Sequence, residues 1–177
     1  MNIFYLDKDV RKCAEQHCKK HSIKMILEYA QLLCTAHRYI DGEQYIELTP
    51  NNRKVKRWKL SDERENVLYK ATHINHPSTV WTRSSDEHYK YVYNLFVELC
   101  NIYTERTGKT HLTETKLKKA LSQIPTNIKH NGFVEPTPAM PDYCKKETSL
   151  ESYRNYYIKE KQHLAEWYLE QPNWFKK

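Results

Sequence analysis

Apolar residues in the first 40 positions recur at the spacing of an amphipathic helix. Asp9 is a suitable N-cap, and the apolar positions then follow the i, i+3, i+4 rule to about Arg38, shortly before the turn pair Asp41-Gly42. We therefore predict one long helix from Asp9 to about Arg38, with one face in the core. The positions that define this face are Ile23, Ile26, Leu27, Ala30, Leu33, Cys34 and His37.

Two further helices are predicted by capping boxes, in which a Ser or Thr is followed three residues later by Glu. The first should end at Gly108, because glycine tolerates the left-handed conformation that follows a helix. The second should run to about Trp167 before Pro172 closes it. The two boxes are Ser84 with Glu87 and Thr148 with Glu151.

The segments between these helices predict smaller elements. Residues 43–60 place β-branched and aromatic residues on both sides of Pro50-Asn51-Asn52, which favours a small β-hairpin. Short helices are expected over Ser61–Tyr69 and from Thr113 to Pro125. Residues 125–147 contain four prolines and predict a long loop on the surface. Together these elements predict a mainly α fold, with the whole chain in a single compact domain.

The composition favours a cytoplasmic protein with a polyanionic partner. Twenty-nine Lys and Arg against 22 Asp and Glu give a net charge of +7. No window approaches the roughly 20 apolar residues of a membrane span, so no membrane association is expected. The five cysteines include no C-x-x-C pair, which predicts reduced thiols and not a disulfide framework. The expected partner is DNA or a nucleotide; composition leaves the oligomeric state open.

One narrow ionisable stripe runs along the first predicted helix. At 100° per residue, His17, His21, Lys24, Glu28 and Gln31 fall within a sector of about 80°. We interpret this stripe as the lining of a substrate cleft, because a solvated face seldom uses two histidines where better helix formers serve. A solvated face is the alternative interpretation.

The stripe offers candidate catalytic residues but no convincing metal site. Lys24 could act as a nucleophile if burial and cationic neighbours favour its neutral form, with Glu28 handling protons. If Glu28 instead faces Lys24 as an ion pair, Lys24 becomes a clamp for a phosphate or carboxylate. His17 and His21 have the i, i+4 spacing of two metal ligands, but Lys24 would repel a cation and no third ligand is evident. We therefore predict no metal and no cofactor.

Two other regions have the composition of a binding surface. The segment from His73 to Arg83 is rich in functional side chains, and Arg83 suits a phosphate while Trp81 could stack on a base or fill the core. Five of the seven residues from Arg53 to Lys59 are basic, which favours contact with a nucleic-acid backbone over a merely solvated hairpin. The candidate binding residues are His73, His76, Trp81, Arg83, Arg53, Lys54, Lys56, Arg57, Trp58, Lys59 and, near the other end, Trp174.

Four short segments, in order along the chain, resemble the pyrimidine-dimer DNA glycosylase/AP-lyase family of phages and bacteria. That family is all-helical and excises damaged bases, so the resemblance implies a helical scaffold and DNA binding. The chain also resembles uncharacterised phage and bacterial proteins of this length. The four segments are Ala14-Glu15-Gln16-His17; His76-Pro77 with Thr79 and Trp81; Glu98 with Arg106, Gly108 and His111; and Pro172-Asn173-Trp174-Phe175-Lys176.

The chain departs from this family at two catalytic positions. The family uses the α-amine of a Thr exposed by removal of Met, whereas position 2 here is Asn. Lys24 stands where the family has its essential Glu, and Glu28 follows one turn later. We expect a DNA- or nucleotide-directed enzyme in which Lys24 attacks C1′ of a flipped nucleotide. A non-catalytic nucleic-acid-binding or phage–host interaction module, and a nucleotide-processing hydrolase, are the alternatives.

Overall fold

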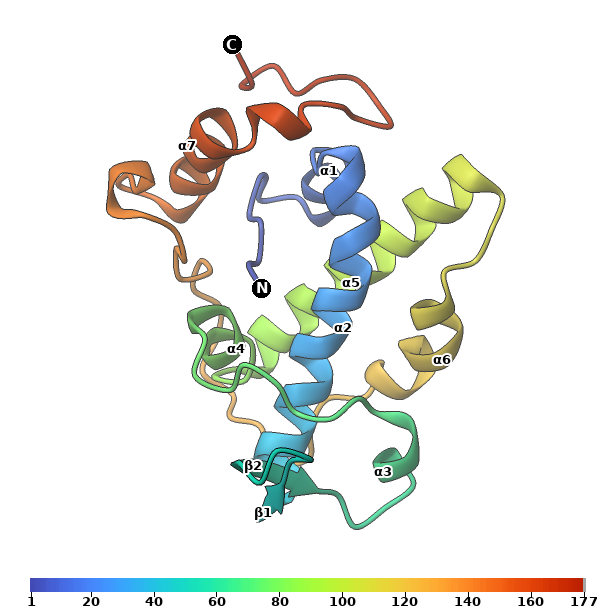
Figure 1. Ribbon diagram of the computed structural model, residues 1–177. Helices are drawn as coiled ribbons and strands as arrows, with labels where there is room; N and C mark the ends of the chain where they lie inside the picture. Colours follow the sequence, from blue (N-terminus) through green and yellow to red (C-terminus); the bar gives the residue numbers. More distant parts are fainter. Residues whose placement is uncertain (177) are drawn as a thin grey trace.

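Two long helices form the centre of the molecule and cross each other in Figure 1. The computed structural model describes residues 1–176. The two helices, α2 (Lys19–Asp41) and α5 (Asp86–Thr107), carry the largest apolar faces of the chain, with Leu33, Phe96 and Leu99 completely buried. The predicted mainly α fold with a small hairpin is therefore confirmed.

Shorter helices cover this central pair. α1 packs on α5, while α4 and α6 both pack on α2 and lie on either side of it in Figure 1. No helix in residues 1–176 is both long and apolar enough to cross a membrane. The shorter elements are α1 (Val10–Glu15), α3 (Arg64–Val67), α4 (Pro77–Thr82), α6 (Leu112–Leu121), α7 (Ser149–Glu160) and the 3-10 turns η1 (Asp142–Cys144) and η2 (Gln162–Leu164).

The predicted hairpin follows α2 directly. β1 (Glu43–Leu48) and β2 (Lys54–Lys59) are antiparallel, with Glu43 opposite Lys59 and Leu48 opposite Lys54. A side chain at Gly42 would collide with the carbonyl oxygen of Arg38, so the glycine lets the hairpin start close to the end of α2. The hairpin therefore projects from the C-terminal end of α2 (Figure 1).

The single helix predicted from Asp9 to Arg38 is wrong, because the chain breaks between Glu15 and Lys19. Asp9 caps only α1, by accepting from the backbone N–H of Lys12. The break is held from the other end of the sequence: Lys19 donates its backbone N–H to the carbonyl oxygen of Glu166 at 2.6 Å, and the Trp167 indole donates to the carbonyl of Gln16 at 2.9 Å. These long-range contacts supply hydrogen-bond partners to backbone groups that a continuous helix would have paired within itself.

The other helix boundaries follow the predicted caps with small shifts. Ser85, not Ser84, caps α5, and the helix ends at Gly108 in the left-handed conformation with φ 67°. The capping box of Thr148 and Glu151 at the start of α7 is confirmed. α7 ends at Glu160 instead of reaching Trp167, and the segment after η2 turns back over the Gln16 break.

The N-terminal segment and the proline-rich loop complete the core. Ile3, Phe4, Tyr5 and Leu6 are all buried, and this segment lies between α7 and α2, where Arg154 donates to the carbonyl of Leu6 at 2.8 Å. Residues 125–147 contain only the turn η1 and cross the surface from α6 to α7, as predicted. All five cysteines are free and buried, so the thiols contribute to the packing.

Candidate functional site around Glu28

A largely buried carboxylate on α2 lies beside two amines. Glu28 Oε1 is 3.0 Å from Lys24 Nζ, and Glu28 Oε2 is 3.6 Å from the α-amine of Met1. Only 15% of the Glu28 side chain is exposed, whereas 61% of the Lys24 side chain is exposed. The Met1 amine reaches Glu28 because the buried N-terminal segment packs against α2. Lys24 and Glu28 are therefore brought together as predicted, in the ion-pair arrangement.

His76 extends this site from the neighbouring helix α4. Its Nδ1 accepts the backbone N–H of Ser78 at 3.2 Å, so the imidazole caps a helix that begins with Pro77. Burial lowers the pKa of His76, the positive charges of the Met1 amine and His73 act in the same direction, and Glu28 opposes them. The charge of Glu28 thus favours the protonated form of His76, although the net shift of its pKa is downward.

Three buried polar oxygens near the start of the chain and of α4 lack a hydrogen-bond partner within the described residues. Asn2 Oδ1, Ser78 Oγ and Thr79 Oγ1 are each inaccessible and unpaired. Buried hydroxyl groups ordinarily find a partner, because leaving one unpaired costs about 1–3 kcal/mol. Asn2 adjoins the Met1 amine, and Ser78 and Thr79 follow His76 in the sequence. These oxygens are therefore buried polar atoms next in sequence to Met1 and His76.

His17 and His21 are buried, so their predicted place in an open cleft is wrong. His17 lies in the break between α1 and α2, where its Nδ1 contacts the carbonyl of Cys13 at 2.7 Å and its Nε2 contacts the Tyr29 hydroxyl at 2.9 Å. His21 Nδ1 lies 2.6 Å from the Tyr157 hydroxyl. Both rings are buried.

The surroundings of both histidines keep them neutral. Burial lowers the pKa of His17 to about 4 and that of His21 to about 3, the latter with help from the positive charges of His17, Lys161 and Lys24. Both nitrogens of His17 already have partners, which leaves none free for a metal. The described residues contain no group of three His, Cys, Asp or Glu side chains that could hold a metal ion.

The solvent-facing side of α2 also differs from the prediction. Ile23 and Leu27, expected in the core, are exposed beside Lys24. The buried face of α2 instead includes Met25 and Tyr29, which lie outside the predicted face. Gln31, the last member of the predicted stripe, is half-buried. The accessible surface at Glu28 is therefore a mixed apolar and charged strip and not a purely ionisable one.

Several side chains of the segment from His73 to Arg83 contribute to packing inside the molecule and are not available to a ligand. Trp81 is buried, donates its indole N–H to the carbonyl of Val134 at 3.2 Å and stacks on His88, so a role in stacking on a base is wrong for it. His73 is exposed and adopts a positive φ of 48°. This segment contains the short helix α4, which the proline after His76 could have indicated.

Arg83 lies in a different place from Lys24. Its guanidinium stacks over the Tyr39 ring at 4.0 Å and donates to the carbonyl of Ile74 at 2.6 Å. It lines an open pocket of about 320 Å³ together with Tyr39, Val80 and Lys129. Burial lowers the pKa of Arg83. The pocket thus has two cations, Arg83 and Lys129, in its lining, and the role of Arg83 in binding a phosphate stays a prediction.

Some side chains of the basic run on the hairpin are exposed to solvent, whereas others are paired or buried within the molecule. Arg53, Lys54, Lys56 and Lys59 are exposed. Arg57 is half-buried and pairs with Glu47 at 2.7 Å, so its charge is already matched. Trp58 is buried against the Tyr39 ring, with centroids 5.3 Å apart, because the base of the hairpin packs on α2. Base contact by Trp58 is therefore excluded.

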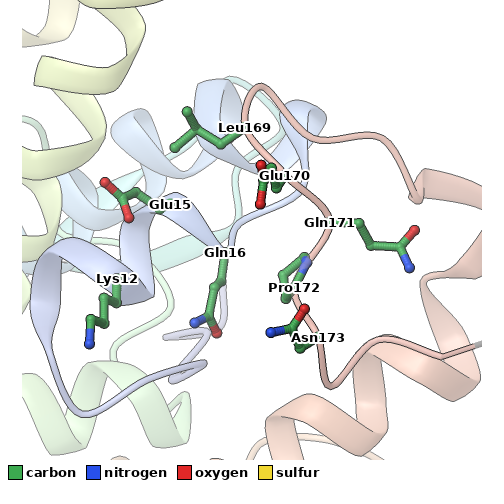
Figure 2. Close-up of a pocket in the computed structure, with 8 residues that line it drawn as sticks. All are labelled: Lys12, Glu15, Gln16, Leu169, Glu170, Gln171, Pro172 and Asn173. Carbon is green, nitrogen blue, oxygen red and sulfur yellow. The ribbon is translucent and has the colours of Figure 1, made fainter.

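Trp174 binds the break after α1 instead of projecting into solvent. Its indole N–H donates to Gln16 Oε1 at 2.7 Å, and Arg154 stacks over its ring. Two of the segments that carry the family resemblance thus meet here. Figure 2 shows the adjoining pocket, about 480 Å³, in which Lys12, Glu15 and Gln16 face the chain from Leu169 to Asn173. Its lining contains Lys12 but no histidine and no cysteine.

Comparison with known proteins leaves the chain without an assigned family. No family model, no curated protein and no solved structure matches it. The resemblance to pyrimidine-dimer glycosylases therefore stays a prediction carried by four short segments. Two features were not predicted from the sequence: the Met1 amine beside Glu28, and the buried, unpaired hydroxyls of Ser78 and Thr79. The apolar run Ile3-Phe4-Tyr5-Leu6 could have indicated that the N-terminal segment is buried.

Proposed function

We propose that this protein acts on DNA or a nucleotide-like substrate at the site around Glu28, removing a damaged or modified base by attack of an amine. The observation that carries the proposal is the position of Glu28, a largely buried carboxylate with an amine on each of its two oxygens. A carboxylate that holds an amine in place and exchanges protons with it is the minimum that imine-forming excision needs. The resemblance to a glycosylase/lyase family supports the same chemistry.

The reaction requires an amine that has given up its proton, so the ion pair must first pass the Lys24 proton to Glu28. Glu28 lies within proton-transfer distance of Lys24 Nζ, and Lys24 is the more exposed of the two amines, so an extruded nucleotide reaches it from solvent. Attack of the neutral amine on C1′ forms the N–C1′ bond and breaks the bond to the base, which leaves with the proton that Glu28 took from Lys24. Opening of the sugar ring then gives an imine. The Met1 amine is the second candidate nucleophile at the same carboxylate.

The main alternative is that Lys24 keeps its proton and only binds phosphate. The observed ion pair and the high exposure of Lys24 favour this clamp role. In that case the protein is a non-catalytic nucleic-acid-binding module, and Glu28 serves to orient Lys24. The two functions share the same surface but differ in whether a covalent intermediate forms.

Borohydride trapping on DNA containing an abasic site separates these functions. The reagent reduces an imine to a stable protein–DNA adduct, which runs as a shifted band on a denaturing gel. We expect an adduct with the wild type and at least tenfold less with Glu28→Gln and with Lys24→Ala, since each removes half of the proton-exchanging pair. Lys20→Ala, an exposed lysine one turn earlier on α2, is the matched control and should trap normally.

The remaining outcomes assign the chemistry elsewhere. An adduct that survives Lys24→Ala and disappears when the Met1 amine is blocked would transfer the nucleophile to Met1. Salt-dependent DNA binding with no adduct in any protein would establish the clamp. Equal trapping by wild type and Glu28→Gln would remove Glu28 from the reaction.

A further inference from the structure

The two faces of the hairpin differ sharply in charge. In the observed register Ile46 lies opposite Lys56 and Leu48 opposite Lys54, and directly opposed residues share a face. Ile46 is 53% exposed and Leu48 is 59% exposed. Neither Lys54 nor Lys56 has an ion-pair partner within residues 1–176. These four residues, which we call the ribbon face, combine open aliphatic surface with unmatched positive charge.

The opposite face of the hairpin is internally neutralised. Glu47 there binds Arg57 at 2.7 Å and Lys70 at 2.9 Å, and Arg57 also donates to the carbonyl of Ala71 at 3.3 Å. This face packs on the segment that follows α3. Because the charges of Glu47, Arg57 and Lys70 are paired within the molecule, this part of the face offers little to a charged partner.

The base of the hairpin is fixed, which makes the ribbon face a rigid projection. Trp58 is buried against Tyr39, and Arg38 donates to the carbonyl of Trp58 at 3.0 Å. The outer part of the same two strands carries the ribbon face. A two-stranded ribbon has the dimensions that the major groove of DNA admits.

We propose that the ribbon face docks in a groove of double-stranded DNA, with Lys54 and Lys56 on the phosphates and Ile46 and Leu48 against sugars and base edges. The proposal rests on the proposed function for the choice of DNA as substrate. Charge complementarity supports it, since the face carries two cations and no carboxylate. A second copy of this chain would oppose lysine to lysine, and its docking is therefore disfavoured.

The ribbon face also explains how the site around Glu28 would hold duplex DNA. The hairpin begins where α2 ends, so both features belong to one helix and its immediate extension. Phosphate contacts at the hairpin would fix the register of the duplex without reading sequence. The aliphatic pair would add contacts that do not depend on salt.

The salt dependence of affinity for a short undamaged duplex tests this proposal. We expect the double variant Lys54→Ala, Lys56→Ala to bind about tenfold more weakly at 0.1 M salt, with the slope of log K against log salt smaller in magnitude by about 2. The double variant Ile46→Ser, Leu48→Ser should lose at least threefold in affinity with an unchanged slope. Lys109→Ala, Lys119→Ala removes the same charge from exposed positions outside the hairpin and should leave both quantities unchanged.

Three results would overturn the proposal. The first is that both ribbon-face variants bind DNA with the affinity and salt slope of the wild type. The second is that these variants lose binding to anionic phosphatidylglycerol vesicles but keep binding to DNA. The third is that the wild type does not bind duplex DNA. Borohydride trapping at saturating DNA should be unaffected by the ribbon-face changes. A ribbon-face effect without any trapped adduct would therefore refute the proposed reaction and leave the docking surface standing.

Discussion

Replacement of Arg38 by methionine is expected to lower the free energy of unfolding by about 3–5 kcal/mol. Arg38 is buried, and all five of its N–H groups have acceptors within 3.0 Å. The change would remove a donor from each of these acceptors, of which Glu65 Oε2 would keep another donor, the backbone N–H of Leu60. The acceptors are the carbonyl oxygens of Trp58, Glu65, Leu68 and Tyr69 and the Oε2 of Glu65.

Urea denaturation with two comparison variants checks this prediction. Arg38→Lys keeps the charge but cannot supply five fixed donors, so it should also lose several kcal/mol. Arg53→Met, at the exposed hairpin turn, should change the free energy of unfolding by less than about 0.5 kcal/mol. An Arg38→Met protein as stable as the wild type would show that the loops around α3 do not depend on this guanidinium.

Acidification from pH 6.5 to pH 4 is expected to lower the free energy of unfolding steeply. Buried histidines stay neutral in the folded state but bind protons once the chain unfolds, so acid favours the unfolded state. Burial lowers the folded-state pKa of His17 to about 4 and of His21 to about 3. In this window the unfolded chain binds more protons than the folded one. The stability present above pH 6.5 therefore falls by about 1.4 kcal/mol per pH unit for each histidine.

Variants isolate this effect from the titration of carboxylates. His17→Gln and His21→Gln should each cost stability at neutral pH, since each breaks a buried hydrogen bond to a tyrosine. Each should also reduce the slope between pH 6.5 and pH 4 by about 1.4 kcal/mol per pH unit. His163→Gln, at an exposed position, should leave the slope unchanged. Identical slopes in all four proteins would contradict the assignment of His17 and His21 as neutral groups.

Local signals predicted most helix ends, although the cap of α5 lies one residue later, at Ser85, than the capping box of Ser84 indicated. The capping box at Thr148 and the glycine stop at Gly108 are short-range effects, and both were correct. The break near Gln16 was not predictable, because the groups that stabilise it come from Glu166 and Trp167. Hydrophobic periodicity carries no information about such distant partners.

The same limitation explains the errors at the candidate site. The helical projection that joined His17 to Lys24 assumed a continuous helix, and it treated imidazoles as accessible groups. Within the core, His17 is instead satisfied by Cys13 and Tyr29. The pairing of Lys24 with Glu28 was predictable, because residues four apart on one helix are neighbours. The Met1 amine was not, since its position depends on the packing of the N-terminal segment.

The most direct test of the proposed function is to identify the residue that carries the trapped DNA. The adduct formed with abasic DNA and borohydride would be digested with protease and nuclease, and the modified peptide sequenced by mass spectrometry. We predict that the sugar remnant lies on an amine that contacts Glu28, either Lys24 Nζ or the α-amine of Met1. A remnant on Lys54 or Lys56 of the hairpin, or no modified peptide at all, would contradict the assignment of the reaction to this site.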